Sequence, residues 1–145
     1  MRALLQRVNS ASVSVQGETV AEISRGVLVF LGVFPEDTGE VAGWLADKTL
    51  GLRIFPDYDK PMNASVMDVA GELLIVSQFT LAADTSRGKR PGFSTAAAPE
   101  LAEKLYSDFV AAVRDRYPRV QTGRFGADMQ VALVNDGPVT FLLER

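Results

Sequence analysis

Two short runs carry the groups that could take part in a reaction: residues 77–81, Ser-Gln-Phe-Thr-Leu, and residues 135–140, Asn-Asp-Gly-Pro-Val-Thr. The chain has no histidine and no cysteine. It therefore cannot build a Ser–His pair, a Cys–His pair, a thiolate nucleophile or a zinc site with imidazole ligands. A reaction must use hydroxyl groups, backbone dipoles, carboxylates or groups that the substrate supplies.

Residues 77–81 have two interpretations. They can form an ordinary strand end in which hydroxyl-bearing and apolar side chains alternate, and the local residues favour this interpretation. Alternatively, Ser77, Gln78 and Thr80 form a polar cluster at a strand terminus, where functional sites often gather. Exposed backbone N–H groups at such a terminus can form an oxyanion hole, and losing one donor slows a reaction by roughly 10²–10³.

Residues 135–140 contain Asn, Asp, Gly and Pro, which are all common in turns. The local sequence therefore predicts a hairpin turn between two strands. Because X–Pro bonds in folded proteins are mostly trans, it also favours a trans bond between Gly137 and Pro138.

Basic residues cluster at Arg87, Lys89 and Arg90. The default interpretation is a solvated surface loop. The alternative is a phosphate-binding loop, because the planar guanidinium group matches the geometry of phosphate oxygens. Arg7, in the first predicted strand, can likewise be an ordinary surface charge.

The carboxylates of Asp57, Asp59 and Asp68 could suggest a metal site. Their spacing fits no calcium-binding loop, so we expect no metal ion. A metal-dependent hydrolase that uses residues 57–68 is the weakest functional interpretation, and loss of activity with a chelator would support it.

The composition predicts one compact domain over residues 1–145, because 47% of the residues are hydrophobic and the length is near the commonest domain size. We expect a cytoplasmic protein, because the chain lacks cysteine and polar residues follow Met1 too closely for a signal peptide. The longest apolar stretch, residues 27–34, is too short to span a membrane. The net charge of −3 argues against broad wrapping of nucleic acid, although a local basic patch could still bind a nucleic-acid end.

The hydrophobic pattern predicts an α+β fold with a mostly antiparallel sheet and two helices that cover it. Predicted strands span residues 2–16, 19–23, 27–31, 52–55, 73–79, 129–134 and 139–143. One predicted helix begins at Asp37 or Thr38 and uses Val41, Trp44, Leu45 and Leu52 as its apolar positions. The clearer helix runs from Pro99 to about Tyr117 and ends before Pro118.

Seven stretches of the chain together resemble the bacterial D-aminoacyl-tRNA deacylases over nearly the full length. They are MRALLQRVNSASVSV at the start, LRIF at 52–55, MNASV at 62–66, GELLIVSQFTL at 71–81, GKRPGFS at 88–94, LYSDFV at 105–110 and TGRFGADMQVALVNDGPVT at 122–140. The SQFTL and GPVT elements, in this order and separation, are the most specific. The chain departs from the family at Lys60-Pro61, where Gly-Lys is usual.

The resemblance implies a homodimer with a barrel-like α+β fold that cleaves the ester between a D-amino acid, or glycine, and the 3′-terminal adenosine of tRNA. It implies no cofactor and no metal, and we expect neither DNA nor a membrane as a partner. It assigns the catalytic site to Ser77, Gln78, Phe79 and Thr80. It assigns the adenosine pocket to Phe125 and Met129 and the tRNA phosphate contacts to Arg87, Lys89 and Arg90.

The resemblance also implies that Gly137 and Pro138, joined by a cis bond, enter the active site of the partner subunit and exclude L-amino acids. Arg7 would hold this element in place. Because no base adjoins Thr80, we expect the ribose 2′-hydroxyl to assist hydrolysis while the N–H groups of Phe79 and Thr80 stabilise the oxyanion. Two alternatives stay open: Thr80 as the nucleophile, and a non-catalytic dimer that binds RNA ends or small amino acids.

Overall fold

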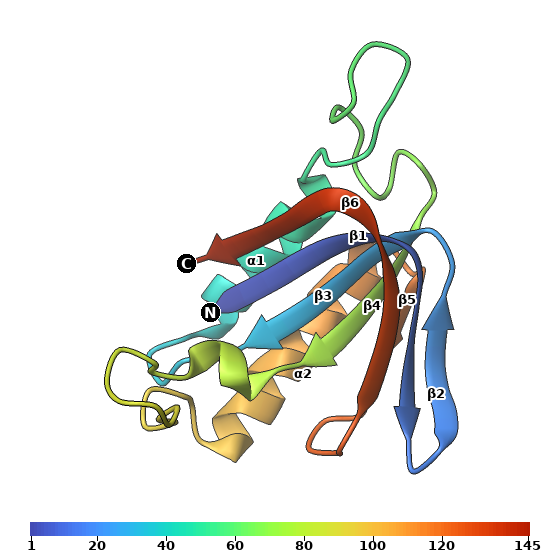
Figure 1. Ribbon diagram of the computed structural model, residues 1–145. Helices are drawn as coiled ribbons and strands as arrows, with labels where there is room; N and C mark the ends of the chain where they lie inside the picture. Colours follow the sequence, from blue (N-terminus) through green and yellow to red (C-terminus); the bar gives the residue numbers. More distant parts are fainter.

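A computed structural model describes residues 1–145 as a strongly bent sheet with two helices packed side by side on one of its faces (Figure 1). The elements in chain order are β1 (Arg2–Val15), β2 (Glu18–Ile23), β3 (Gly26–Gly32), α1 (Gly39–Gly51), β4 (Glu72–Ser77), the 3₁₀ helix η1 (Phe79–Ala82), α2 (Pro99–Arg116), β5 (Val120–Thr122) and β6 (Gln130–Glu144). Neither helix has the length and apolar character that crossing a membrane would require.

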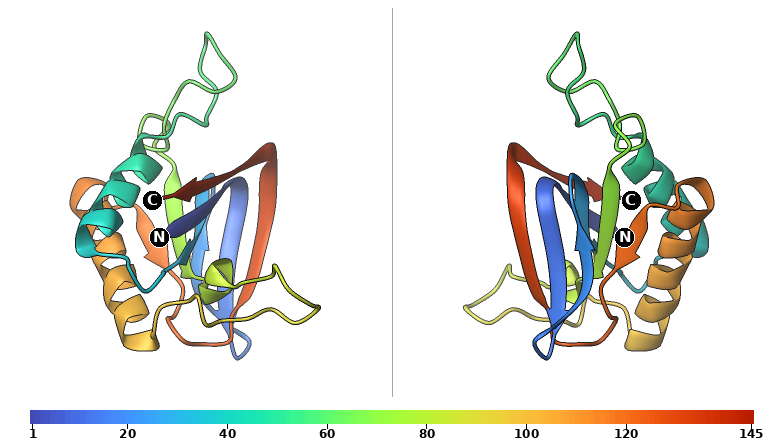
Figure 2. Two further views of the ribbon diagram at one scale, coloured as in Figure 1. Left: turned by 90° about the vertical axis from the view of Figure 1, so that its left-hand side faces the viewer. Right: turned by 90° about the vertical axis from the view of Figure 1, so that its right-hand side faces the viewer.

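The strand order is β2-β1-β3-β4-β5, and β6 pairs with β1. Strand β1 is antiparallel to β2, β3 and β6, whereas β4 is parallel to both β3 and β5. The long strands β1 and β6 bend together, so that the sheet curls into a nearly closed barrel (Figure 2). The predicted α+β, barrel-like class with two covering helices is therefore confirmed, with a sheet that is mixed.

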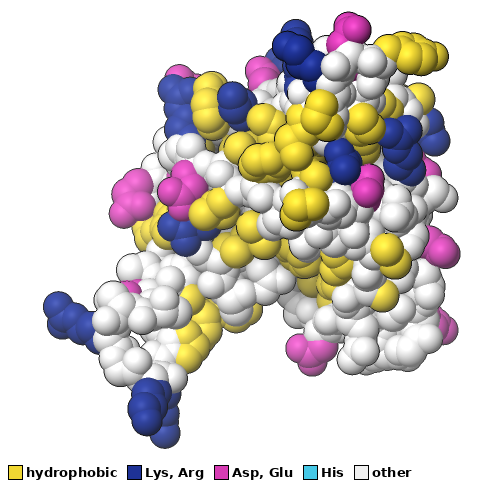
Figure 3. Space-filling view, turned by 45° about the horizontal axis from the view of Figure 1, so that its top comes forward, with side chains coloured by type: hydrophobic (Ala, Val, Ile, Leu, Met, Phe, Trp, Pro, Cys, Tyr) yellow, Lys and Arg dark blue, Asp and Glu magenta, His cyan; other side chains and the backbone are white.

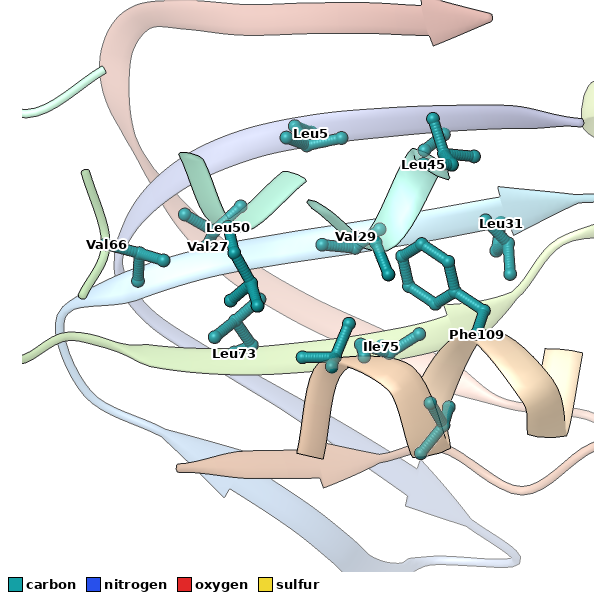
Figure 4. Packing of buried hydrophobic residues seen from close by; sticks show 14 of the residues in the cluster. Leu5, Val27, Val29, Leu31, Leu45, Leu50, Val66, Leu73, Ile75 and Phe109 are labelled. Atoms are coloured by element: carbon teal, nitrogen blue, oxygen red, sulfur yellow. The ribbon is translucent and has the colours of Figure 1, made fainter. Parts of the chain in front are cut away.

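Strands β3 and β4 are buried on both faces, which explains their uninterrupted apolar sequences. One face, with Val29 and Ile75, packs against the helix residues Leu45 and Phe109 (Figure 4). The opposite face belongs to a second cluster, in which Leu28, Leu74 and Val76 meet Val8, Val13 and Ile23 from β1 and β2. Strands β3 and β4 thus face the helices on one side and β1 and β2 of the curled sheet on the other.

The two helices follow the predicted pattern with two exceptions, Trp44 and Leu52, and Leu52 lies just beyond the end of α1. The buried residues of α2 are Leu105, Tyr106, Phe109, Val110 and Val113. In α1, the Thr38 hydroxyl caps the helix by accepting a hydrogen bond from the Val41 N–H group. Trp44, expected on the apolar face, is 37% exposed, and the Arg145 guanidinium lies over its ring, 4.7 Å from the centroid.

Three predictions of local structure are wrong: one strand end, one strand and one turn. The strand predicted over residues 73–79 ends at Ser77, and residues 52–55 form no strand beyond an isolated bridge between Phe55 and Ala64. Residues 135–140 are not a hairpin turn, because both halves of β6 run antiparallel to the same strand, β1, and the chain never reverses direction.

Candidate active site

A cavity of about 470 Å³ opens where β3 and β4 end, next to η1. Most of its lining residues are apolar, and the full set is Leu31, Val33, Ser77, Gln78, Phe79, Ala97, Pro99, Ala102, Phe125, Gly126, Ala127, Asp128 and Met129. The polar side chains Ser77 and Gln78 thus face a largely apolar hollow. Such a combination is typical of a site for a small molecule or the end of a larger one.

The strand β4 turns into η1 at the wall of this cavity. The N–H group of Gln78 donates to the Leu31 carbonyl at 2.8 Å and prolongs the pairing with β3 by one bond. The first hydrogen bond of η1 then runs from the Leu81 N–H group to the Gln78 carbonyl, at 3.1 Å. The N–H groups of Phe79 and Thr80 therefore precede the first bond of the helix, a position where donors lack an intrahelical acceptor. The Gln78 side-chain amide donates to the Thr80 hydroxyl.

Contacts that the sequence did not indicate fix η1 against the sheet. The Arg2 guanidinium donates to the Leu81 carbonyl at 2.6 Å, and the Thr95 hydroxyl donates to the Ala82 carbonyl at 2.5 Å. At Gly32, the end of β3 approaches η1 so closely that a Cβ atom would lie 2.9 Å from the Leu81 Cβ. No local motif marks these residues, because each acts through a contact distant in the sequence.

Two aromatic rings and a basic loop adjoin η1 on its solvent side. Phe79 is 57% exposed and packs against Phe93 with 5.1 Å between ring centroids and 54° between the ring planes. The intervening loop is closed by paired backbone hydrogen bonds between Asp84 and Gly92. It is an arm with basic side chains near its tip (Figure 3, lower left), and its cations Arg87, Lys89 and Arg90 are exposed.

The opposite wall of the cavity contains Phe125 and Met129, the two residues predicted for the adenosine pocket. The Phe125 ring lies 5.9 Å from the Tyr106 ring, centroid to centroid. The buried Tyr106 hydroxyl donates to the Ile75 carbonyl at 3.0 Å, and burial raises the pKa of Tyr106 to about 12. At Gly123 a Cβ atom would lie 2.8 Å from the Met129 sulfur, so glycine makes room for that side chain.

The segment around Pro138 is held by hydrogen bonds at its base. Arg7 pairs with the Asp136 carboxylate at 2.9 Å, and its guanidinium also donates to the Ile54 carbonyl at 2.6 Å. The Asn135 side-chain amide donates to the Arg7 carbonyl at 2.9 Å and to the Val139 carbonyl at 3.1 Å. The sequence prediction included Arg7 but not this role of Asn135.

Between these anchors, β6 loops away from β1. Asn135 pairs with Val8 and Thr140 pairs with Gln6, so four residues of β6 stand against one residue of β1. Gly137 and Pro138 lie in this excursion, are exposed, and are joined by a cis peptide bond.

The looped segment, residues 136–139, and the cavity lie at opposite ends of the central strands β3 and β4. Arg7, which binds Asp136, is paired with Val27 of β3, whereas Ser77 is paired with Leu31. These two positions of β3 are four residues apart, which corresponds to about 13 Å at the usual rise of a strand. Within one chain, Gly137 and Pro138 therefore do not line the cavity.

The acidic residues of the 56–69 loop serve as local acceptors. The pKa of Asp57 is lowered by hydrogen bonds from the Lys60 backbone and from the Asn63 side chain. The pKa of Asp68 is lowered by hydrogen bonds from the backbone and hydroxyl of Ser65. These turn-forming bonds account for the carboxylates of Asp57 and Asp68, and the backbone N–H group of Asp59, the third residue weighed as a metal ligand, donates to Asp57.

The sequence belongs to a known group of proteins. The protein family described as D-Tyr-tRNA(Tyr) deacylase matches residues 4–144. The chain is 58% identical to the D-aminoacyl-tRNA deacylase of Erwinia tasmaniensis over 144 residues, which cover 99% of each chain. It is 56% identical to that of Thermotoga petrophila over 144 residues, which cover 99% of this chain and 97% of the relative.

Two solved structures share the fold. One, described as c-Myc DNA Unwinding Element Binding Protein, has a TM-score of 0.94 and 43% identity and covers 100% of this chain and 99% of its own. Another, described as a probable eukaryotic D-amino acid tRNA deacylase, has a TM-score of 0.85 at 21% identity, with 98% and 97% covered, and supports the fold alone. The resemblance inferred from the sequence is confirmed: the chain belongs to the D-Tyr-tRNA(Tyr) deacylase family and is a hydrolase of D-aminoacyl-tRNA.

Proposed function

We propose that the protein cleaves the ester between a D-amino acid, or glycine, and the 3′-terminal adenosine of tRNA in the cavity beside η1. The observation that carries this proposal is the pair of N–H groups that precede the first bond of η1: that of Phe79, which lines the cavity, and that of the next residue, Thr80. They could stabilise the oxyanion that forms when water attacks the ester carbonyl. The bond to the ribose 3′-oxygen then breaks, releasing the amino acid and the tRNA.

The substrate's own 2′-hydroxyl is the group that we propose activates water or polarises the ester. An unactivated hydroxyl is a poor nucleophile at neutral pH, and the chain contains no histidine to activate Thr80. The Thr80 hydroxyl accepts a hydrogen bond from Gln78, an arrangement suited to positioning reactants. Ser77, like Gln78 and Asp128, is a polar residue of the cavity wall.

A substrate that ends in 2′-deoxyadenosine tests this mechanism. We expect D-aminoacyl-tRNA with the normal 3′ end to be hydrolysed and the deoxy version, esterified at the 3′-oxygen, to be nearly inert. Near-normal turnover of the deoxy substrate would refute assistance by the RNA and favour Thr80 as the nucleophile. If neither substrate is cleaved, the protein is a binding module for RNA ends.

Selection against L-amino acids is proposed to need two subunits. The Gly137–Pro138 segment of one protomer would enter the cavity of its partner, where its main-chain oxygens accept the substrate's α-ammonium and leave no room for an L side chain. A D side chain projects elsewhere, and glycine has none to exclude. The segment is exposed, and its anchor Arg7 is paired four residues of β3, about 13 Å, away from the position paired with Ser77; both observations support a cross-subunit role.

An apolar face on the curled sheet supports the homodimer. Leu4 of β1 is paired with Phe30 of β3 and with Leu142 of β6, so the three side chains share one face. Leu142 is 50% exposed. A second copy of the chain would remove this surface from water.

The terminal adenosine is proposed to lie against Phe125 and Met129, with Arg87, Lys89 and Arg90 near acceptor-stem phosphates. None of these three cations forms an ion pair within the chain, so all are free to bind phosphate. The net charge of −3 and the restriction of this basic cluster to one loop favour a tRNA end over duplex DNA as the nucleic-acid partner. The compartment that holds charged tRNA, the cytoplasm, is the proposed location.

A further inference from the structure

A second hollow, of about 810 Å³, lies directly behind the cavity. The two share Ala127, Asp128 and Met129 as a common wall. The remaining lining residues of this groove are Ser14, Val15, Gln16, Gly17, Gln130 and Ala132. It thus extends from the wall shared with the cavity to the tip of the β1–β2 hairpin.

The polar side chains of the groove have no partner within the chain. Ser14, Gln16, Asp128 and Gln130 take part in no side-chain hydrogen bond or ion pair, and the last three are exposed. The rim has a defined conformation, because Gln16 and Gly17 have φ values of 50° and 80°, the left-handed pair of a two-residue hairpin turn. A defined rim with unpaired amide, hydroxyl and carboxylate groups suits the edge of a nucleobase.

The position of the groove relative to the cavity indicates which base it would take. The ester is proposed to lie at residues 77–80 and the adenosine against Met129, on the far wall. The ribose 5′-oxygen leads away from the 3′-ester, so the chain of nucleotides continues beyond the adenosine. The groove lies beyond Met129, on the side away from residues 77–79, where the preceding nucleotide would therefore lie.

We infer that this groove binds the nucleotide that precedes the terminal adenosine, which in tRNA is a cytidine. A cytosine offers its N4 amino group as a donor and N3 and O2 as acceptors. Asp128 is the natural acceptor for N4, and the amides of Gln16 and Gln130 can donate to the ring acceptors. Single-stranded RNA is commonly read through these edges. The inference rests on the proposed function, whose adenosine site it extends.

Shortening the substrate provides the test. The ratio of kcat/KM for D-aminoacyl-tRNA to kcat/KM for the D-aminoacyl ester of adenosine alone measures what the rest of the RNA contributes. We expect Gln16→Gly, which suits the left-handed backbone, and Gln130→Ala each to lower this ratio about tenfold, equivalent to about 1.4 kcal/mol. The control Glu18→Gln, on an exposed residue just outside the groove, should leave the ratio unchanged.

A base exchange sharpens the test. Replacing the penultimate cytidine by uridine should lower kcat/KM about tenfold, because uracil presents O4 as an acceptor where cytosine presents a donor. Asp128→Asn should reverse the preference, since an amide can donate to O4. Equal rates for the two RNAs together with an unmoved ratio in Gln16→Gly would overturn the inference while leaving the deacylase function intact. If no substrate is cleaved, the proposed function itself fails.

Discussion

Replacing Arg7 by lysine should weaken both the fold and the discrimination against L-amino acids. The guanidinium donates to the Ile54 carbonyl at 2.6 Å, pairs with Asp136 at 2.9 Å, and has only 11% of its side chain exposed. A lysine has a single ammonium group and cannot reproduce a fork that reaches two acceptors on different segments. One of the two acceptors should lose its charged partner.

The expected magnitude follows from that loss. A hydrogen bond to a charged group contributes about 1.5–3 kcal/mol, so we expect Arg7→Lys to lower the free energy of unfolding by about 2 kcal/mol. A small displacement of the looped segment should lower the preference for D- over L-amino acids at least tenfold, because a tenfold change corresponds to only about 1.4 kcal/mol. Urea unfolding measures the first quantity, and hydrolysis of matched L- and D-tyrosyl-tRNA measures the second.

Arg25→Lys is the matched control. The Arg25 guanidinium lies 5.3 Å from the centroid of the Phe55 ring, over which Arg7 also lies at 5.9 Å, but Arg7 alone of the two pairs with Asp136 of the looped segment. We expect this variant to retain full discrimination. The reasoning is refuted if Arg7→Lys still rejects L-tyrosyl-tRNA as the unaltered protein does, or if Arg25→Lys loses discrimination equally.

Three further predictions concern the walls and the approach of the cavity. Because the pKa of Tyr106 is raised to about 12 in the folded protein, the native state keeps a proton that the unfolded state loses near pH 10. The free energy of unfolding should therefore fall by about 1.4 kcal/mol per pH unit between pH 10 and 12. This slope should vanish in Tyr106→Phe. Gly32→Ala should push η1 away at Leu81 and reduce kcat at least tenfold, whereas Gly43→Ala, where a Cβ meets nothing within 4 Å, should leave kcat unchanged. Changing the three cations of residues 87–90 to glutamine should reduce the slope of log affinity for tRNA against log salt concentration by about 2 without altering the L-to-D ratio, and an unchanged slope would remove this loop from the proposed interface.

The sequence predicted the elements well where the hydrophobic pattern is regular. The spacing of apolar residues defined α2, and the apolar sequences at 27–31 and 73–79 indicated the strands that became β3 and β4. It failed where a distant partner decides the conformation. The turn-forming residues 135–140 lie within a continuous strand because both flanking halves find their partner in β1.

The candidate site shows the same division. Residues 77–79, which line the cavity, belong to the run 77–80 that the sequence singled out by its polar residues and its resemblance to a known family. Arg2 and Asn135 were not predictable, because their roles depend on carbonyl groups that are brought near them only by folding. Phe79 was placed in a strand, although the end of the pairing with β3 allows η1 to begin there.

The cross-subunit origin of the site is the central claim, and a mixed dimer tests it most directly. One protomer would carry Pro138→Ala, which alters the looped segment, and the other Ala102→Phe, which fills the cavity from α2. A dimer of the first variant should be active without rejecting L-tyrosyl-tRNA, and a dimer of the second should be inactive.

In the purified mixed dimer, the one open cavity belongs to the first protomer. Our account predicts that this cavity receives the unaltered segment of its partner, so the mixed dimer should cleave D-tyrosyl-tRNA and reject L-tyrosyl-tRNA as strongly as the unaltered protein does. Hydrolysis of L-tyrosyl-tRNA at the rate of the Pro138→Ala dimer would contradict it, because each chain would then use its own segment or none.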